Sequence, residues 1–132
     1  MVILDETYNA APEAMVAALN LLAETSGKRR IAVLGAMKEL GDKSEELHQL
    51  VGKTASSLNL DSLMVLTDCA DAQALAKSAE GIPIACYSTH NELTIALKQY
   101  LKDGDRILFK AAHSVGLNKV VNRLRETVNS EQ

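Results

Sequence analysis

Short apolar runs alternate along the chain with longer stretches in which apolar residues recur every three or four positions. The short runs are typical of β-strands, and the longer period is typical of amphipathic helices. The expected strands cover residues 2–4, 30–36, 63–66, 84–87 and 106–110. The expected helices cover residues 12–23, 44–55, 70–79, 91–101 and 115–128.

Strands that alternate with helices indicate βαβ units with right-handed crossovers and a mostly parallel sheet. The run at 31–34 is continuously apolar, which suits a parallel strand covered on both faces. We therefore expect an α/β fold, a three-layer Rossmann-like domain with a sheet of about five to six strands. It spans residues 1–132 without a linker or repeat. Because the chain begins almost inside a strand, we expect a domain excised from a larger protein.

Local signals fix the expected ends of several helices. Pro12 suits a first helical turn, where its missing N–H needs no partner. Gly27 is expected to cap the first helix at its carboxyl end, and Ser44 is expected to be the N-cap of the second. His48 is interpreted as a structural residue inside that helix, and His90 as a surface loop residue.

Composition excludes several classes of function. The net charge of −3 and the absence of Trp argue against nucleic-acid binding, which uses basic patches and aromatic stacking. Cys69 and Cys86 belong to no CxxC pair, so free thiols in a reducing cytoplasm are expected rather than a zinc site. No apolar run approaches the roughly 20 residues that span a bilayer, and no signal peptide is visible.

Ligands of open parallel sheets gather beyond the carboxyl ends of the strands. Asp5 and Glu6 follow the first expected strand, and a carboxylate there could accept hydrogen bonds from ribose hydroxyls. The alternative is that the two acids merely favour the positive end of the following helix. The residues alone favour this second interpretation.

Residues 35–44 do not match the phosphate-binding P-loop, which needs Gly, four residues, then Gly-Lys-Ser/Thr. Here five residues separate Gly35 from Gly41, and Asp42 intervenes before Lys43. The spacing is wrong and the acid would repel phosphate, and no GxGxxG motif occurs either. If ATP is used, most of its triphosphate contacts must come from elsewhere.

Polar residues also follow the last expected strand. Lys110 could hold a phosphate or carboxylate as a point charge, and His113 could donate a hydrogen bond to a carboxylate. The alternative is a solvated lysine with His113 or Ser114 capping a helix, and the residues alone leave the choice open. The histidines are too dispersed to suggest a metal site, and no nucleophile context appears. We therefore expect no catalytic residue and no metal in this domain alone.

Three segments together resemble the C-terminal domain of the Mur ligase family. Residues 4–12 (Leu-Asp-Glu-Thr-Tyr-Asn-Ala-Ala-Pro) are similar to the stretch that opens that domain. Residues 33–41 (Val-Leu-Gly-Ala-Met-Lys-Glu-Leu-Gly) and 46–48 (Glu-Leu-His) are similar to a second motif, and residues 108–113 stand where the family has Val-Lys-Gly-Ser-Arg. The order and spacing agree along essentially the whole chain.

The resemblance implies one domain of a three-domain cytoplasmic enzyme of peptidoglycan synthesis. Such ligases use ATP and Mg²⁺, bound mainly by a central domain, to activate a carboxylate as an acyl phosphate that an amine then attacks. The motifs are most similar to the branch that adds D-alanyl-D-alanine to UDP-N-acetylmuramoyl-tripeptide. The C-terminal domain closes over the cleft as a lid, contacts the nucleotide and positions the amine, so alone it should be inactive. The residues implied at the ATP ribose and base are Asp5, Glu6, Tyr8 and Asn9. The residues implied at the substrate are Lys110, His113 and Ser114.

This sequence departs from the family pattern at several positions. Glu6 replaces an Asp, Ala11 an Asn and Ala36 an Asp, and residues 111–113 replace Gly-Ser-Arg. The departures leave room for a related Mur or folylpolyglutamate-type ligase with another amino component. A stand-alone, non-catalytic Rossmann-like binding module is the alternative from another class.

Overall fold

The computed structural model describes residues 1–7 and 10–130, with side chains described through residue 126. The strands are β1 (Val2–Glu6), β2 (Arg29–Leu34), β3 (Ser62–Leu66), β4 (Ile84–Tyr87) and β5 (Asp105–Lys110). The α-helices are α1 (Pro12–Glu24), α2 (Ser44–Ser57), α3 (Ala70–Ser78), α4 (His90–Tyr100) and α5 (Leu117–Ser130). Short 3₁₀ turns, η1 (Gly41–Lys43) and η2 (His113–Val115), precede α2 and α5.

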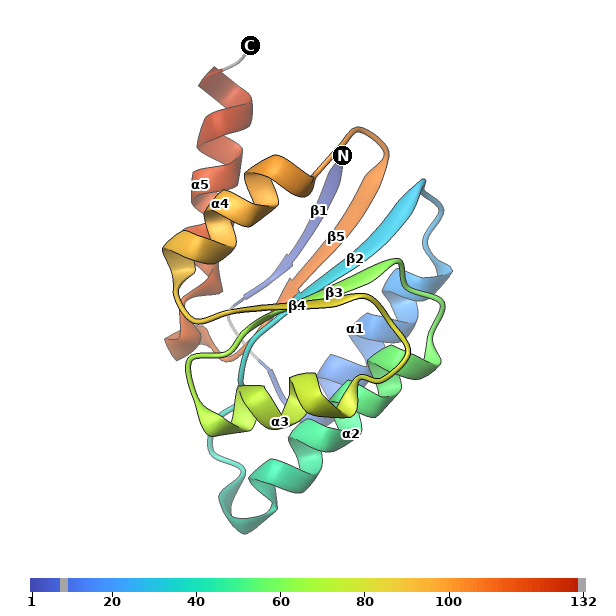
Figure 1. Ribbon diagram of the computed structural model, residues 1–132, viewed down its shortest axis with the longest axis vertical. Coiled ribbons are helices and arrows are strands. Elements are labelled where there is room, and N and C mark those ends of the chain that lie inside the picture. The colour runs from blue at the N-terminus through green and yellow to red at the C-terminus, as the bar shows by residue number, and fades with distance from the viewer. Residues whose placement is uncertain (8–9, 131–132) are drawn as a thin grey trace.

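Within the described part of the chain, five strands form one sheet in the order β1-β5-β2-β3-β4. Every neighbouring pair is parallel. The crossovers that join β1, β2, β3 and β4 all run in one direction across the sheet and place α1, α2 and α3 on one face (Figure 1). The chain then returns through α4 to β5, and α4 and the following α5 cover the other face. The expected three-layer α/β domain is confirmed.

The core lies on both faces of the central strands. Every residue of β3 is buried, as are residues 31–34 of β2. Phe109, the single phenylalanine of the chain, is fully buried in β5. These are the continuous apolar runs of the sequence, and helices on both faces explain why they do not alternate with polar residues.

The expected roles of Ser44 and Gly27 at the helix ends are wrong. The η1 turn runs directly into α2, so Ser44 already has helical backbone angles and Lys43 occupies the cap position. The Ser44 hydroxyl instead donates to Asp71 Oδ2 at 2.7 Å. α1 ends at Glu24 and Thr25 is extended, so no left-handed glycine is needed at residue 27.

No helix among the described residues combines the length and the apolarity that a bilayer span requires. The longest helices have 14 residues, and α2 carries charged residues along its length.

A partly buried ion pair joins the amino ends of β2 and β5. The Arg29 guanidinium donates to both Asp105 carboxylate oxygens, at 2.8 and 2.7 Å, and to the Tyr100 carbonyl at 2.7 Å. It also lies 4.2 Å from the centroid of the Tyr100 ring. Burial acts to raise the pKa of Asp105, but hydrogen bonds from Arg29 and the Lys102 N–H outweigh it and hold that pKa below its ordinary value. The folded state therefore favours the charged carboxylate.

Replacing Asp105 by Asn should destabilise the domain by about 3 kcal/mol at pH 7, because the Arg29 guanidinium loses its charged partner. Because the folded pKa of Asp105 is lowered, its contribution is complete above the ordinary carboxyl pKa of about 4 and falls as the pH drops through the folded value. The stability difference from wild type should therefore shrink between pH 5 and pH 2–3, as measured by urea unfolding (pH values approximate). Asp103→Asn, at an exposed turn position, is the control and should show neither effect. A difference that stays constant with pH would contradict this account.

Candidate functional site

The carboxyl ends of β1, β5 and β2 form the edge of the sheet at which the chain changes direction. β1 and β2 both lead to helices on one face, whereas β5, which lies between them, leads to α5 on the other (Figure 1). Loops that diverge in this way leave room for a ligand beyond the strand ends. This edge is therefore the candidate site.

A buried lysine lies at the centre of this edge. Lys110, the last residue of β5, is 5% exposed, and its register neighbours are Glu6 of β1 and Leu34 of β2. Its ammonium lies 3.1 Å from Glu6 Oε2, and the Glu6 side chain is 44% exposed. A lysine so deeply buried needs a charged or polar partner. The Glu6 carboxylate supplies one and also reaches solvent, where a ligand can approach.

Asp5 is held in a different direction from Glu6. Its Oδ1 accepts hydrogen bonds from the Thr7 N–H at 3.2 Å and the Thr7 hydroxyl at 2.8 Å. Its Oδ2 lies 3.6 Å from the Arg125 guanidinium of α5. Successive strand residues point to opposite faces, so the two adjacent acids do not form a carboxylate pair. Tyr8 and Asn9, expected beside them, lie outside the described residues.

His113 and Ser114 belong to the η2 turn, and both side chains are exposed. The turn follows Lys110 after two buried alanines, Ala111 and Ala112. It lies at the same edge as the Glu6–Lys110 pair, but the charged pair comes from β1 and β5 alone. His113 therefore stands on the rim of the candidate site.

The interpretation of His90 as a surface loop residue is wrong. His90 is the first residue of α4, is only partly exposed, and its Nε2 lies 2.6 Å from the carbonyl oxygen of Val115. The imidazole N–H donates to that carbonyl and fixes the end of the η2 turn. Sequence reasoning missed this contact, because nothing local to His90 signals a partner in a different loop.

The loop after β2 is bound to the loop after β5. The Gly35 N–H donates to the Lys110 carbonyl at 3.1 Å, and the Ala112 N–H donates to the Ala36 carbonyl at 2.9 Å. A Cβ at Gly35 would lie 2.9 Å from Val115 Cγ1 and 3.0 Å from Ala111 Cβ, so only glycine fits without displacement. The two loops therefore form one continuous wall of the site.

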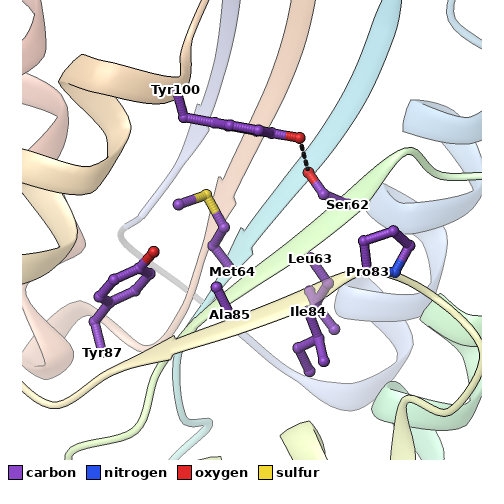
Figure 2. A pocket seen from close by; sticks show the side chains of 8 residues that line it. All are labelled: Ser62, Leu63, Met64, Pro83, Ile84, Ala85, Tyr87 and Tyr100. Carbon is purple, nitrogen blue, oxygen red and sulfur yellow. Dashed lines mark hydrogen bonds between the residues drawn. The ribbon is translucent and has the colours of Figure 1, made fainter.

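A hollow of about 180 Å³ lies away from this edge, on the face of β3 and β4 beside the end of α4. Figure 2 shows Met64 between the side chains of Tyr87 and Tyr100, with the Tyr100 hydroxyl donating to Ser62 Oγ at 3.0 Å. None of the described residues that line this hollow has a charged side chain. Such a lining does not suit phosphates or charged peptide ends, so the hollow is not the candidate site.

The described residues contain no group of three or more His, Cys, Asp or Glu that could hold a metal ion. The chemistry available at the carboxyl edge is therefore that of single charged groups: one buried ammonium, nearby carboxylates and an exposed imidazole. These groups can bind and orient ligand oxygens and amines, but none forms a nucleophile–base arrangement.

Comparison with known proteins identifies the family of the chain. A family model described as "Mur ligase, glutamate ligase domain" matches residues 1–113. The chain is 51% identical over 124 residues to the UDP-N-acetylmuramoyl-tripeptide–D-alanyl-D-alanine ligase of Synechocystis sp., covering 94% of this chain and 27% of that protein. It is 35% identical over 127 residues to the ligase of the same name from Escherichia coli, covering 94% of this chain and 27% of that protein.

Solved structures resemble the chain as well. The MurF ligase from Thermotoga maritima in complex with ADP superimposes with a TM-score of 0.83 at 31% identity, covering 98% of this chain and 29% of that one. A MurF structure from Acinetobacter baumannii gives a TM-score of 0.79 at 26% identity, covering 94% of this chain and 27% of that one. The chain thus spans little more than a quarter of the relatives that it matches. Its sequence motifs, its fold and the match over residues 1–113 together establish that it belongs to the Mur ligase family, in the glutamate ligase domain.

Proposed function

We propose that this chain is the C-terminal domain of an ATP-dependent ligase that adds D-alanyl-D-alanine to UDP-N-acetylmuramoyl-tripeptide in peptidoglycan synthesis. The 51% identity to a ligase of that name carries the proposal. The rest of the enzyme, comprising a central ATPase domain and an N-terminal domain, would supply the phosphate-binding loop and the Mg²⁺ site. The complete enzyme would act in the cytoplasm, where ATP is available.

The groups at the carboxyl edge fit part of a nucleotide rather than all of it. Glu6 and Asp5 offer carboxylate oxygens that can accept hydrogen bonds from ribose hydroxyls, and the ADP bound to the Thermotoga maritima relative is consistent with such a role. Residues 35–44 lack P-loop spacing, so the triphosphate would lie on the central domain. Tyr8 and Asn9 are proposed to contact the base or ribose beside them.

Lys110, His113 and Ser114 are proposed to hold the amino component. D-Alanyl-D-alanine brings an amine that must attack the acyl phosphate and a carboxylate that does not react. The Lys110 ammonium can bind that carboxylate or an oxygen of the activated substrate as a fixed point charge. Closure of the domain over the cleft would exclude water, which otherwise hydrolyses an acyl phosphate. The domain thus positions groups and supplies no nucleophile.

Phosphate release from ATP by the full-length enzyme, given UDP-N-acetylmuramoyl-tripeptide, should depend on D-alanyl-D-alanine. Release can be followed with and without the dipeptide, and with single amino acids in its place as controls. Release that another amino component supports equally well would assign the chain to a different ligase branch. No dependence on any amine would favour a binding module.

Lys110→Met in the full-length enzyme should lower kcat/KM for the dipeptide by about 100-fold, the effect of losing a charged hydrogen bond. The free energy of unfolding should change by less than about 1 kcal/mol, because methionine fills the buried space and the exposed Glu6 carboxylate is solvated by water. Lys53→Met, at an exposed position of α2, is the matched control for kinetics and urea unfolding. If the two variants have equal kinetics, Lys110 does not bind the substrate.

The domain of residues 1–132 alone should show no ligase activity, because it lacks P-loop spacing and the described residues offer no metal cluster. Phosphate release by the purified domain, assayed with ATP, Mg²⁺ and both substrates, tests this. Adding the missing domains as a separate chain is the positive control. Turnover by the domain alone would contradict the proposed division of labour.

A further inference from the structure

His48 is fully buried on α2 and uses both ring nitrogens. Its Nε2 accepts a hydrogen bond from the Met37 N–H at 2.9 Å. Its Nδ1 lies 2.7 Å from the Ser44 carbonyl oxygen, and because a carbonyl can only accept, Nδ1 carries the proton. One tautomer of the ring therefore satisfies both contacts and joins the loop after β2 to the first turn of α2.

The first turn of α2 is a firm anchor for this contact. The Ser44 hydroxyl donates to Asp71 Oδ2 at 2.7 Å, which ties the start of α2 to α3. Ser44 and Asp71 are both only partly exposed. The Met37 N–H is thereby fixed, through His48, to the layer of helices that covers one face of the sheet.

The loop of residues 37–41 is held in a backbone conformation that it would not adopt freely. Glu39 has φ of +60°, a left-handed value that is unfavourable for a residue with a Cβ. The Met37 side chain is fully buried and Leu40 packs against the core, whereas the side chains of Lys38 and Glu39 are exposed. The loop thus has buried anchors and presents two charged side chains at its tip.

This loop lies on one particular side of the site. β5 separates β2 from β1, so the loop and the Asp5–Glu6 carboxylates flank Lys110 on opposite sides. The hydrogen bond from the Ala112 N–H to the Ala36 carbonyl joins the start of the loop to the segment that leads into His113. The loop is therefore next to the residues proposed for the amino component and away from those proposed for the nucleotide.

We propose that His48 is a positioning residue that holds the 37–41 loop as a wall of the subsite for the amino component. The proposal rests on the proposed ligase function and extends it from the residues after β5 to the loop after β2. His48 acts through the Met37 backbone and does not touch the ligand. Losing its hydrogen bond lets the strained loop relax and weakens binding of the dipeptide rather than of ATP.

Two amide substitutions in the full-length enzyme separate the ring's two contacts. In His48→Gln, the side-chain oxygen reaches about as far as Nε2 and can accept from the Met37 N–H. In His48→Asn, the side-chain amide reaches about as far as Nδ1 and can donate only to the Ser44 carbonyl. His48→Asn should raise KM for D-alanyl-D-alanine about tenfold and leave KM for ATP within about twofold, whereas His48→Gln should stay within about threefold of wild type for both.

Amide hydrogen exchange of the same full-length proteins measures how well the amides of the 37–41 loop are protected when no substrate is bound. Protection of the segment around Met37 should be lost in His48→Asn and kept in His48→Gln. Val51→Ala, a cavity-forming change at a fully buried position of α2, controls for loss of stability and should change neither KM nor loop protection.

The outcomes separate the inference from the proposed function. Equal effects of the Asn and Gln variants on KM, or a parallel rise in KM for ATP, would overturn the positioning role. A wild-type enzyme that ignores the dipeptide would overturn the proposed function and, with it, the assignment of the loop to that subsite. In that case the exchange contrast alone decides whether His48 holds the loop, and its absence would refute that contact as well.

Discussion

The position of β5 between β1 and β2 is the constraint on which the rest of the structure depends. It reverses the direction of the crossovers, sends α4 and α5 to the second face, and makes the loops at the carboxyl edge diverge. It also makes β5 a central strand, so that its polar ends become buried together with its apolar middle. The sheet order therefore determines where the candidate site lies and which charged side chains lie beside it.

β5 begins and ends with a buried charged residue, and the two residues differ in how their partners hold them. Asp105 at the amino end is 1% exposed and is held by Nε and Nη2 of a guanidinium that lies against an aromatic ring. Lys110 at the carboxyl end is 5% exposed, but its carboxylate partner Glu6 is almost half exposed. A bidentate, stacked pair favours rigidity, whereas an ion pair whose acid is already solvated can exchange that acid for a ligand oxygen. The first pair suits stability, and the second suits a binding site.

The walls of the site come from backbone contacts rather than from charged side chains. Hydrogen bonds from Gly35 and Ala112 join the loops after β2 and β5, and His90 fixes the turn that bears His113. His48 holds the loop beyond Gly35 from the other side. These contacts involve two loops and two helices on opposite faces of the sheet, so the edge is shaped by the packing of whole layers. A domain of this kind can hold ligand-binding side chains on a rigid backbone.

The sequence by itself determined the element types, their order, the parallel sheet and the family. Apolar runs at 31–34 and 63–66 have only one stable environment, a sheet covered on both faces, and the segments at 4–12 and 33–41 are local motifs. It also indicated that His48 is structural, because a histidine among apolar helix positions is expected to be buried. The carboxyl-terminal cap of α1 and the N-cap of α2 were predicted wrongly, because an extended Thr25 and the η1 turn replaced the expected glycine and serine signals.

Only the tertiary structure decided the contacts between distant parts of the chain. The Glu6–Lys110 pair joins the first and last strands, and Arg29 and Asp105 are 76 positions apart. The partners of Ser44 and His90 likewise come from other elements. Local propensity does not encode such pairings, because they depend on how whole strands and helices pack. The Glu6–Lys110 and Arg29–Asp105 pairs follow from the insertion of β5 between β1 and β2.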